Sequence, residues 1–271
     1  MIVDFHSHTR ESDGSLEPQA LVDLMAERKV EVFAISDHDS LGAFGRFQAP
    51  AGARVITGIE INTTWRGNEV HVLGYGVGLD DPTFAELIER NRRSRRERME
   101  RIVQNLRVAG YGVSMEDVER EADSGAALGR PHVGKALITK GYFSDINSAF
   151  KTALSRGGPG YMPQTYITPA QSIAAIHAAD GVAVLAHPGR LKDEAIIDEM
   201  VGHGLDGLEV FYPRHDAEDV ARYRAVCAKH DLVMTAGSDF HDIRYNTGGV
   251  GMEVAESDIA PFLERVSTTS R

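Results

Sequence analysis

The stretch IVDFHSHTRESDGS, residues 2–15, begins with a short apolar run and continues directly into histidine and aspartate side chains. Residues 2–5 are typical of a buried β-strand, and His6, His8 and Asp13 follow them. One interpretation is a surface turn that happens to contain histidines. The other is a metal site, because side chains alternate along an extended chain and His6 and His8 then point to the same side.

Strand-like runs recur along the chain, with helix-like runs between them. This alternation is typical of parallel strands joined by helices, and seven or eight such strands favour a closed barrel over an open sheet. Neither a Gly-x-Gly-x-x-Gly motif after the first strand nor a Gly-Lys-Ser/Thr phosphate-binding motif occurs. The expected strands span residues 2–5, 32–36, 54–61, 69–77, 181–188, 207–212 and 232–239.

Residues 83–165 interrupt this alternation of strands and helices. The segment PTFAELIERNRRSRRERMERIVQNLRVAG, residues 82–110, predicts one long helix, and shorter helical runs without an obvious strand follow it. We therefore expect an α/β barrel domain formed by residues 1–82 and 166–271, with residues 83–165 as a helical insertion that caps it. The shorter helical runs lie around residues 115–122, 131–141 and 144–154.

The long helix carries many arginines between residues 90 and 101, and they lie all round its circumference. Glutamates stand four residues before several of them, as in Glu86–Arg90 and Glu97–Arg101, and this spacing stabilises an exposed helix. We expect a solvated helix. The alternative is that one or two of these arginines face the substrate.

The composition limits the classes of partner. The chain has 29 basic and 40 acidic residues, a formal charge of −11, which argues against broad electrostatic adhesion to nucleic acid but not against a small basic pocket. Its single cysteine, Cys227, excludes an intramolecular disulfide. We see no leader peptide and no apolar run of about 18 residues. The expectation is a soluble cytoplasmic protein with no membrane association and no obligate protein partner.

Metal-capable side chains stand at the ends of most expected strands. Because the carboxyl ends of parallel strands form one rim of a barrel, these side chains should converge there. A single histidine in such a place is more often a satisfied core residue, but many buried carboxylates together repel one another unless cations are bound. The set exceeds what one ion needs and suits Mn²⁺, with Zn²⁺ or Fe²⁺ as alternatives. Its members are His6, His8, Asp13, His38, Glu60, His71, His187, Asp239 and His241.

Six short motifs, taken together and in this order, resemble the PHP family, the polymerase and histidinol phosphatase domains. They are DFHSHTRESDG (4–14), AISDHDSLGAF (34–44), GIEINT (58–63), HVLGYG (71–76), LAHPGR (185–190) and GSDFH (237–241). The resemblance spans most of the chain apart from the insertion. It implies a distorted seven-stranded (β/α) barrel and a cluster of three metal ions that hydrolyses phosphate esters.

The resemblance also implies how the ligands are shared among three ions. One ion would be held by His6, His8, Glu60 and Asp239, a second by Asp13, His38 and His241, and a third by Glu60, His71 and His187. Asp13, His38 and His241 would then take part in catalysis as ligands of the metals that activate the attacking water. The roles of Asp37, Asp39 and Glu209 stay open: each either orients an imidazole or is an ordinary cap or core carboxylate.

Chain length and insertion make the sequence similar to the stand-alone PHP proteins that act on nucleoside 3′,5′-bisphosphates, relatives of which trim short RNA from the 5′ end. The alternatives are a phosphatase of the histidinol phosphate or sugar phosphate type, a metal-dependent amide or lactone hydrolase, and a non-catalytic metal-binding module. The hydrolase alternative often needs a bridging carboxylated lysine, and none of the strand-end motifs contains a lysine.

Substrate phosphates need cations besides the metals. The motif GRPHVGK, residues 129–135, offers such groups, and Pro131 can start a helix whose free N–H groups bind anions. Each of these residues is alternatively an ordinary surface charge. The substrate-binding candidates are Arg130, His132, Lys135, Arg156 and Arg190.

Overall fold

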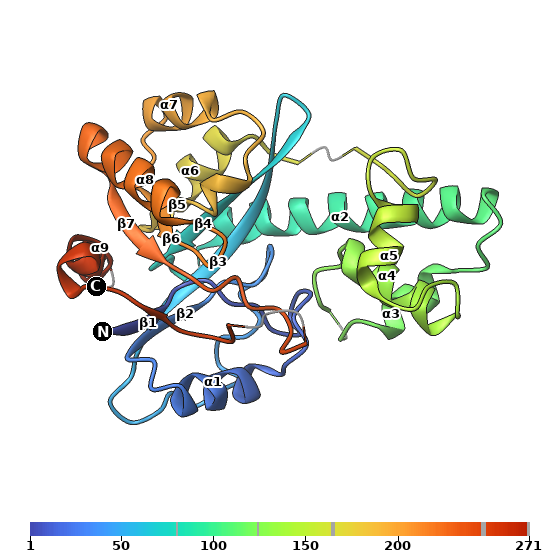
Figure 1. Cartoon of the computed structure of the whole chain (residues 1–271), viewed down its shortest axis with the longest axis horizontal. Coiled ribbons are helices and arrows are strands. Elements are labelled where there is room, and N and C mark those ends of the chain that lie inside the picture. Colours follow the sequence, from blue (N-terminus) through green and yellow to red (C-terminus); the bar gives the residue numbers. More distant parts are fainter. Residues whose placement is uncertain (80, 124, 164–165, 245–247, 270–271) are drawn as a thin grey trace.

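A mixed sheet of eight strands, counted over the described residues, forms the centre of the molecule and curves into a nearly closed barrel (Figure 1). The computed structural model describes residues 1–79, 81–123, 125–163, 166–244 and 248–269. The spatial order of the strands is β7-β6-β5-β4-β3-β2-β1-β8. Their bounds are β1 Ile2–Asp4, β2 Val32–Ile35, β3 Arg54–Trp65, β4 Asn68–Tyr75, β5 Val182–Leu185, β6 Gly207–Phe211, β7 Val233–Ala236 and β8 Met252–Glu253.

Helices cover the outside of the barrel and form the insertion. On the barrel they are α1 Pro18–Glu27, α6 Pro169–Ala178, α7 Ala195–Gly202, α8 Ala217–His230 and α9 Glu256–Thr269, with a 3₁₀ turn at Pro188–Arg190. The insertion contains α2 Pro82–Val108, α3 Met115–Arg120, α4 Arg130–Thr139 and α5 Ile146–Ala149, followed by a π-helical turn at Phe150–Leu154. In the part of the chain that the structure describes, no helix is both long and apolar enough to cross a membrane.

The expectation of parallel strands is wrong for β4, and β8 lies outside the expected strands. Strand β4 pairs antiparallel with both β3 and β5, and β8 pairs antiparallel with β1. Strands β3 and β4 are antiparallel because a two-residue hairpin turn joins them at Arg66 and Gly67, which have φ of 46° and 75°. Positive φ at both turn positions matches the twist of the flanking strands and so favours a tight hairpin. As a result β3 continues to Trp65, well past Glu60, and the sheet is a distorted barrel.

Backbone hydrogen bonds beyond the strand ends bring β1 and β7 together. Phe5 N–H donates to the carbonyl of Ala236 at 2.9 Å, and His8 N–H donates to the carbonyl of Phe240 at 2.8 Å. Asp239 N–H donates to the carbonyl of His6 at 2.8 Å. These bonds connect the ends of β1 and β7, so the segments that follow the two strands lie side by side at one rim.

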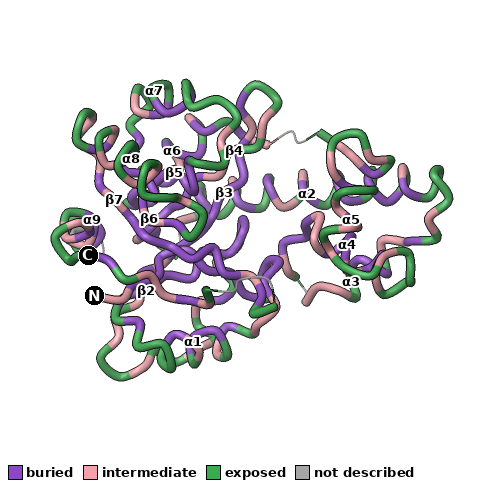
Figure 2. Tube along the Cα trace, viewed as in Figure 1, coloured by how far each residue is buried: buried purple, intermediate pink, exposed green. Residues whose placement is uncertain are grey.

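The barrel interior is apolar below that rim. Phe262 of α9 packs against Phe5 and Tyr75, with ring centroids 4.9 and 5.1 Å apart. Burying each such aromatic ring stabilises the fold by about 1.5–3 kcal/mol. Figure 2 shows the strands as largely buried and the outer turns of the helices as exposed. The apolar interior therefore supports the polar rim from beneath, and Phe5 is followed directly by His6.

The long helix α2 belongs to two hydrophobic clusters. Its first turns place Phe84 and Ile88 against the barrel, and its later turns place Met99, Ile102 and Leu106 in a separate core with α3 and α4. Figure 1 shows α3, α4 and α5 gathered beside the far half of α2, away from the sheet. Domain boundaries at residues 83 and 165 remain a prediction, and residue 165 lies outside the described residues.

The arginines of α2 are not uniformly solvated, which corrects the sequence-based expectation. Arg95 and Arg98 are only 4% and 8% exposed. Arg95 Nε donates to Asp39 Oδ2 at 2.6 Å, and Arg98 donates to the carbonyl of Met162 at 3.0 Å. Arg96, by contrast, is exposed and pairs with Glu100 and Glu119. Helix α2 therefore has a buried polar face toward the barrel rim.

Candidate metal centre

Strand pairing continues past the strand ends and sets the positions of the histidines. Asp39 N–H donates to the carbonyl of Glu60 at 2.9 Å, which holds the segment after β2 against β3. Ala186 N–H donates to the carbonyl of His71 at 3.1 Å, which holds the segment after β5 against β4. Asn62 faces His71 across the β3–β4 hairpin. Glu60, two residues before Asn62, therefore shares the face that carries His71.

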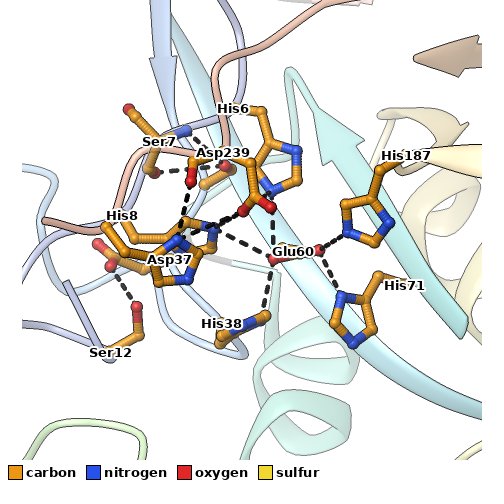
Figure 3. A network of polar contacts seen from close by, with 12 residues as sticks. His6, Ser7, His8, Ser12, Asp37, His38, Glu60, His71, His187 and Asp239 are labelled. Atoms are coloured by element: carbon orange, nitrogen blue, oxygen red, sulfur yellow. Dashed lines mark hydrogen bonds and ion pairs between the residues drawn. The ribbon is translucent and has the colours of Figure 1, made fainter. Parts of the chain in front are cut away.

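The Glu60 carboxylate lies at the centre of the site, fully buried, with five imidazoles around it (Figure 3). Its Oε2 is 3.2 Å from Nε2 of His6, 3.2 Å from Nε2 of His8 and 3.0 Å from Nδ1 of His38. Its Oε1 is 2.6 Å from Nδ1 of His71 and 3.2 Å from Nε2 of His187. Each carboxylate oxygen thus faces its own group of histidines, as a carboxylate that bridges cations must.

The structure brings all of the predicted metal ligands together around Glu60. Asp239 Oδ1 lies 3.5 and 3.4 Å from the Nε2 atoms of His6 and His8. Asp13 Oδ1 lies 3.3 Å from Nε2 of His241. Three groups have donor atoms close enough to share one ion each. They are His6, His8, Glu60 and Asp239; His8, Asp13, His38 and His241; and His38, Glu60 and His71. Two groups differ from the sets that the family resemblance implied. The second also contains His8, and the third contains His38 in place of His187, which borders the same carboxylate.

Several buried atoms of the site have no good hydrogen-bond geometry to any group in the described part of the chain. They are Nε2 of His6, both ring nitrogens of His8, Oδ1 of Asp13, Oε2 of Glu60 and Nε2 of His71. Such atoms cost about 1–3 kcal/mol each when they remain unsatisfied. Imidazole nitrogens and carboxylate oxygens are ligands that first-row divalent cations accept. The residues therefore fit divalent cations, which would satisfy these atoms.

The pKa shifts of the site also indicate that it suits divalent cations. Burial raises the pKa of the Glu60 carboxyl, but the imidazoles of His38, His71 and His6 outweigh it and hold that pKa well below its usual range. Burial lowers the pKa of His8, whereas the close Asp239 and Glu60 carboxylates raise it to about 10. The carboxylates thus stabilise positive charge at this position. A divalent cation supplies that charge and leaves the imidazoles neutral, which is the form that binds metal.

Buried carboxylates next to the cluster position its histidines. Glu209 of β6 is fully buried, and its Oε1 lies 2.9 Å from Nδ1 of His6. Its Oε2 accepts the backbone N–H of His187 at 2.7 Å. The chain passes very close here, because a Cβ at Gly237 would lie 2.5 Å from Glu209 Oε1. Glu209 therefore fixes the ring of His6 with Nε2 toward the centre.

Asp37 and Asp39 have different roles. Asp37 accepts Thr9 N–H at 2.7 Å and Ser12 Oγ–H at 2.6 Å, which fixes the loop that leads to Asp13. Asp39 is bound by Arg95 and by the side-chain amide of Asn62, and that amide also lies 3.1 Å from Nδ1 of His38. Asp39 therefore connects α2 to the metal centre.

Substituting Glu209 with glutamine should weaken metal binding. The amide keeps the size of the side chain but replaces a charged partner of His6, and losses of about 10- to 100-fold in affinity are typical for such partners. Titration of the purified variant with Mn²⁺, followed by calorimetry, measures the effect. Glu218→Gln, an exposed change on α8, is the matched control. Unchanged affinity in Glu209→Gln would show that Glu209 only supports the fold.

Three residues of the site have left-handed backbone conformations that non-glycine residues rarely adopt. Asp39, His187 and Asp239 have φ of 46°, 30° and 51°. Each follows the end of a strand and is buried. Such conformations cost about 1–3 kcal/mol each and persist where the surroundings enforce them, commonly at functional sites.

A cavity of about 200 Å³ lies over the metal centre and is lined by both the cluster and the insertion. We call it the arginine cavity because Arg95, Arg98, Arg130 and Arg190 line it. Arg95 is almost fully buried, and its Nη2 has no hydrogen-bond partner in the described part of the chain. This arginine therefore presents an unused donor beside the candidate metals, which suits an anionic ligand.

The predicted substrate-binding residues do not all lie in one cavity. Arg130 lies in the arginine cavity and pairs with Glu69 at 3.0 Å, and Arg190 pairs with Asp239 at 3.1 Å. His132 is buried, and its Nδ1 accepts the N–H of Gly129 at 3.0 Å, so it caps α4. Burial lowers the pKa of His132 to about 4, which keeps it neutral. Lys135 faces a different cavity, and Arg156 is exposed and lines neither one.

Sequence reasoning missed several polar residues of this site. Tyr212 donates its hydroxyl to Asp239 Oδ2 at 3.0 Å, and Asn62 links His38 to Asp39. Tyr212 directly follows β6, so its place at a strand end was an available signal. No feature of the sequence distinguishes Arg95 from the other arginines of α2.

Comparison with known proteins places the chain among phosphoesterases. No protein-family model matches the sequence. It is 34% identical to the 5′-3′ exoribonuclease Rnm of Escherichia coli K12, over 89% of this chain and 85% of the relative. It is 31% identical to the 3′,5′-nucleoside bisphosphate phosphatase of Chromobacterium violaceum, over 88% and 87%. A phosphoribosyl 1,2-cyclic phosphate 1,2-diphosphodiesterase of Eggerthella lenta is 33% identical, over 89% and 94%.

The similar solved structures include the same class of protein, a metal-dependent phosphoesterase. An amidohydrolase from Chromobacterium violaceum with bound sulfate and no metal superposes with a TM-score of 0.89 and 28% identity, covering 98% of this chain and 96% of that one. A protein from Bifidobacterium adolescentis, assigned as a metal-dependent phosphoesterase, has a TM-score of 0.79 and 30% identity, covering 88% and 87%. With this identity to its relatives, and with the histidine and carboxylate cluster in place, the chain belongs to the PHP family of metal-dependent phosphoesterases, which are hydrolases.

Proposed function

We propose that this enzyme binds Mn²⁺ at three positions in the cluster and hydrolyses the 3′ phosphate of nucleoside 3′,5′-bisphosphates. The observation that carries the proposal is the Glu60 carboxylate with histidines on both of its oxygens, directly beside the arginine cavity. The proposed ligand sets are those implied by the family resemblance, and His38 lies between the second and third positions. Zn²⁺ or Fe²⁺ are the alternative ions.

The arginine cavity supports a substrate with two phosphates. One phosphate would lie on the cluster, close to Arg190. The second would lie toward the insertion, where Arg95, Arg98 and Arg130 meet. We propose that the insertion, residues 83–165, acts as a cap and selects substrates through this second anion position. The name of the Chromobacterium violaceum relative supports the same substrate class.

The chain's own residues would bind and orient the substrate. Bound divalent cations supply an activated water and neutralise the charge that develops on the phosphate. Arg190, held by Asp239, would stabilise the oxygens of the reacting phosphate. Arg95, held by Asp39, would fix the other phosphate and so align the first. The products would be the 5′-mononucleotide and inorganic phosphate. Short RNA trimmed from its 5′ end is a further proposed substrate, in keeping with the name of the Escherichia coli relative.

A substrate panel tests this proposal. We expect phosphate release from nucleoside 3′,5′-bisphosphates with the highest kcat/KM, and little dependence on the base. Histidinol phosphate, sugar phosphates, a ribose 1,2-cyclic phosphate and amide and lactone substrates complete the panel. Preference for one of the other phosphates would overturn the substrate assignment. Hydrolysis of amides or lactones in place of phosphate esters would overturn the reaction class.

Removal of metal should abolish activity, and Mn²⁺ should restore it best. The ligand set combines imidazoles and carboxylates without a thiolate, and Cys227 is buried within the helix α8. The measurement is bisphosphate hydrolysis after chelation and after adding back Mn²⁺, Zn²⁺ or Mg²⁺. Full activity of the chelated protein would contradict the metal assignment, and a clear preference for Zn²⁺ would contradict the choice of manganese.

A further inference from the structure

A second and larger cavity lies beside the metal centre. Its volume is about 660 Å³, against about 200 Å³ for the arginine cavity. We call it the large cavity; Lys135, Asn147, Tyr212 and Arg214 are part of its lining. The two cavities share Asp13, Asp239 and His241. Both therefore border the position of the reacting phosphate, and their other walls come from different elements.

The large cavity has positive groups available for a ligand. Lys135 of α4 and Arg214, in the segment after β6, line it, and neither forms an ion pair within the described ranges. Arg190 and Arg244 also line it, each beside a carboxylate, that of Asp239 or Asp242. Asp13, Asp239 and Asp242 line the cavity as well, so its four cationic side chains outnumber its three carboxylates by one. Lys135 and Arg214 suit a ligand that carries further phosphates.

The lining suits a phosphate backbone better than a base. Two described lining residues have aromatic rings: Tyr212, which is only 4% exposed, and His241, which is a candidate metal ligand. The hydroxyl of Tyr212 is occupied by Asp239 at 3.0 Å. Sites that recognise bases stack them on exposed aromatic rings, whereas cationic side chains position phosphates without reading sequence.

We propose that the large cavity binds the phosphate backbone of a short single-stranded oligonucleotide, downstream of the bond that is cut. This inference rests on the proposed function, because the terminal 5′ phosphate must occupy the arginine cavity. That cavity, at about 200 Å³, has less than a third of the volume of the large cavity, at about 660 Å³. The chain beyond the reacting phosphate is therefore assigned to the larger space. The rest of the oligonucleotide leaves through the large cavity, which makes the enzyme act from the 5′ end.

The reaction balances with water alone. The oxygen of water forms a bond to the phosphorus between the first and second nucleotides, and the bond from that phosphorus to the 3′ oxygen of the first nucleotide breaks. The 3′ oxygen takes up a proton. The products are a 5′-mononucleotide and an oligonucleotide shorter by one, which carries a new 5′ phosphate. That phosphate can enter the arginine cavity for the next cycle.

Arg214→Gln tests the inference, because Arg214 lines the large cavity and not the arginine cavity. With a 5′-phosphorylated RNA tetranucleotide, we expect kcat/KM to fall about tenfold, as for loss of one charge-assisted contact. The slope of log KM against log salt should decrease by about 0.7. With a nucleoside 3′,5′-bisphosphate, kcat/KM should change less than about twofold. Arg101→Gln, an exposed change on α2, should leave both substrates unaffected.

The outcomes separate this inference from the proposed function. Equal losses on both substrates, or no loss on the tetranucleotide, would overturn the inference. Wild-type protein that cleaves the bisphosphate but not the tetranucleotide would overturn it and leave the proposed function intact. If neither substrate is cleaved, the proposed function fails. Binding of a fluorescent phosphorothioate-linked tetranucleotide to the wild-type protein and to Arg214→Gln then tests the inference by itself. Weaker binding by Arg214→Gln supports the inference, and unchanged binding overturns it.

Discussion

Glu60→Gln should reduce both metal content and activity more than any other single substitution at the rim. Glu60 contacts five imidazoles and belongs to two of the three candidate ion groups. Removing one partner from buried charged groups costs about 3–5 kcal/mol, which corresponds to a loss of a hundredfold or more. Metal analysis of the purified protein, together with kcat/KM for a nucleoside bisphosphate, measures both effects.

His71→Asn is the matched comparison. His71 belongs to one ion group, and its Nδ1 contacts only one of the two Glu60 oxygens. We expect this variant to lose part of its metal and to keep more activity than Glu60→Gln. Unchanged metal stoichiometry in Glu60→Gln would show that Glu60 does not bridge ions. Thermal unfolding of both variants separates metal loss from loss of the fold.

Arg130→Met should raise KM for nucleoside bisphosphates by about 10- to 150-fold, the equivalent of ~1.5–3 kcal/mol for a charge-assisted hydrogen bond. Arg130 lines the arginine cavity at the start of α4, where it pairs with Glu69 and lies over the ring of Phe150. Turnover of a small aryl phosphate should barely change, because that substrate has no second phosphate for the cap. Steady-state kinetics on both substrates measures the difference.

Arg156→Met is the control for charge removal from the insertion, because Arg156 is exposed and lines neither cavity. We expect a much smaller effect on KM for the bisphosphate than in Arg130→Met. Equal losses on the bisphosphate and the aryl phosphate in Arg130→Met would show that Arg130 supports the fold or the metals and does not select the substrate.

The convergence of the predicted metal ligands could be predicted from the sequence because most of them follow an apolar run. His6 and His8 follow β1, and Asp239 and His241 follow β7, and backbone hydrogen bonds between the segments after these two strands bring the four residues together. The helices of the insertion could also be predicted from the sequence. Its periodic apolar residues form their own core with α3 and α4.

The hairpin between β3 and β4 was harder to predict, although a signal was present. Arg66 and Gly67 separate two alternating runs, but Arg-Gly is a weaker turn signal than Asn-Gly or Asp-Gly. Without the hairpin, Glu60 was expected at a strand end. The structure places it inside a longer strand, where Asn62 and His71 face each other.

The role of Arg95 could not be predicted, for a physical reason. The arginines of α2 lie all round the helix, so periodicity assigns none of them to a face. The position of Asp39, held at a φ of 46° beside β3, determines which of these arginines forms the buried ion pair. Likewise, which histidine completes the third ion group depends on side-chain distances around Glu60 and not on sequence spacing.

The central claim is that the histidines and carboxylates around Glu60 hold the catalytic metal ions. The most direct measurement is anomalous X-ray scattering from crystals of the protein saturated with Mn²⁺. The account predicts three peaks around the Glu60 carboxylate, one between His6, His8 and Asp239, one near Asp13 and His241, and one near His71. Peaks elsewhere, or none at this cluster when the protein is fully active, would contradict it.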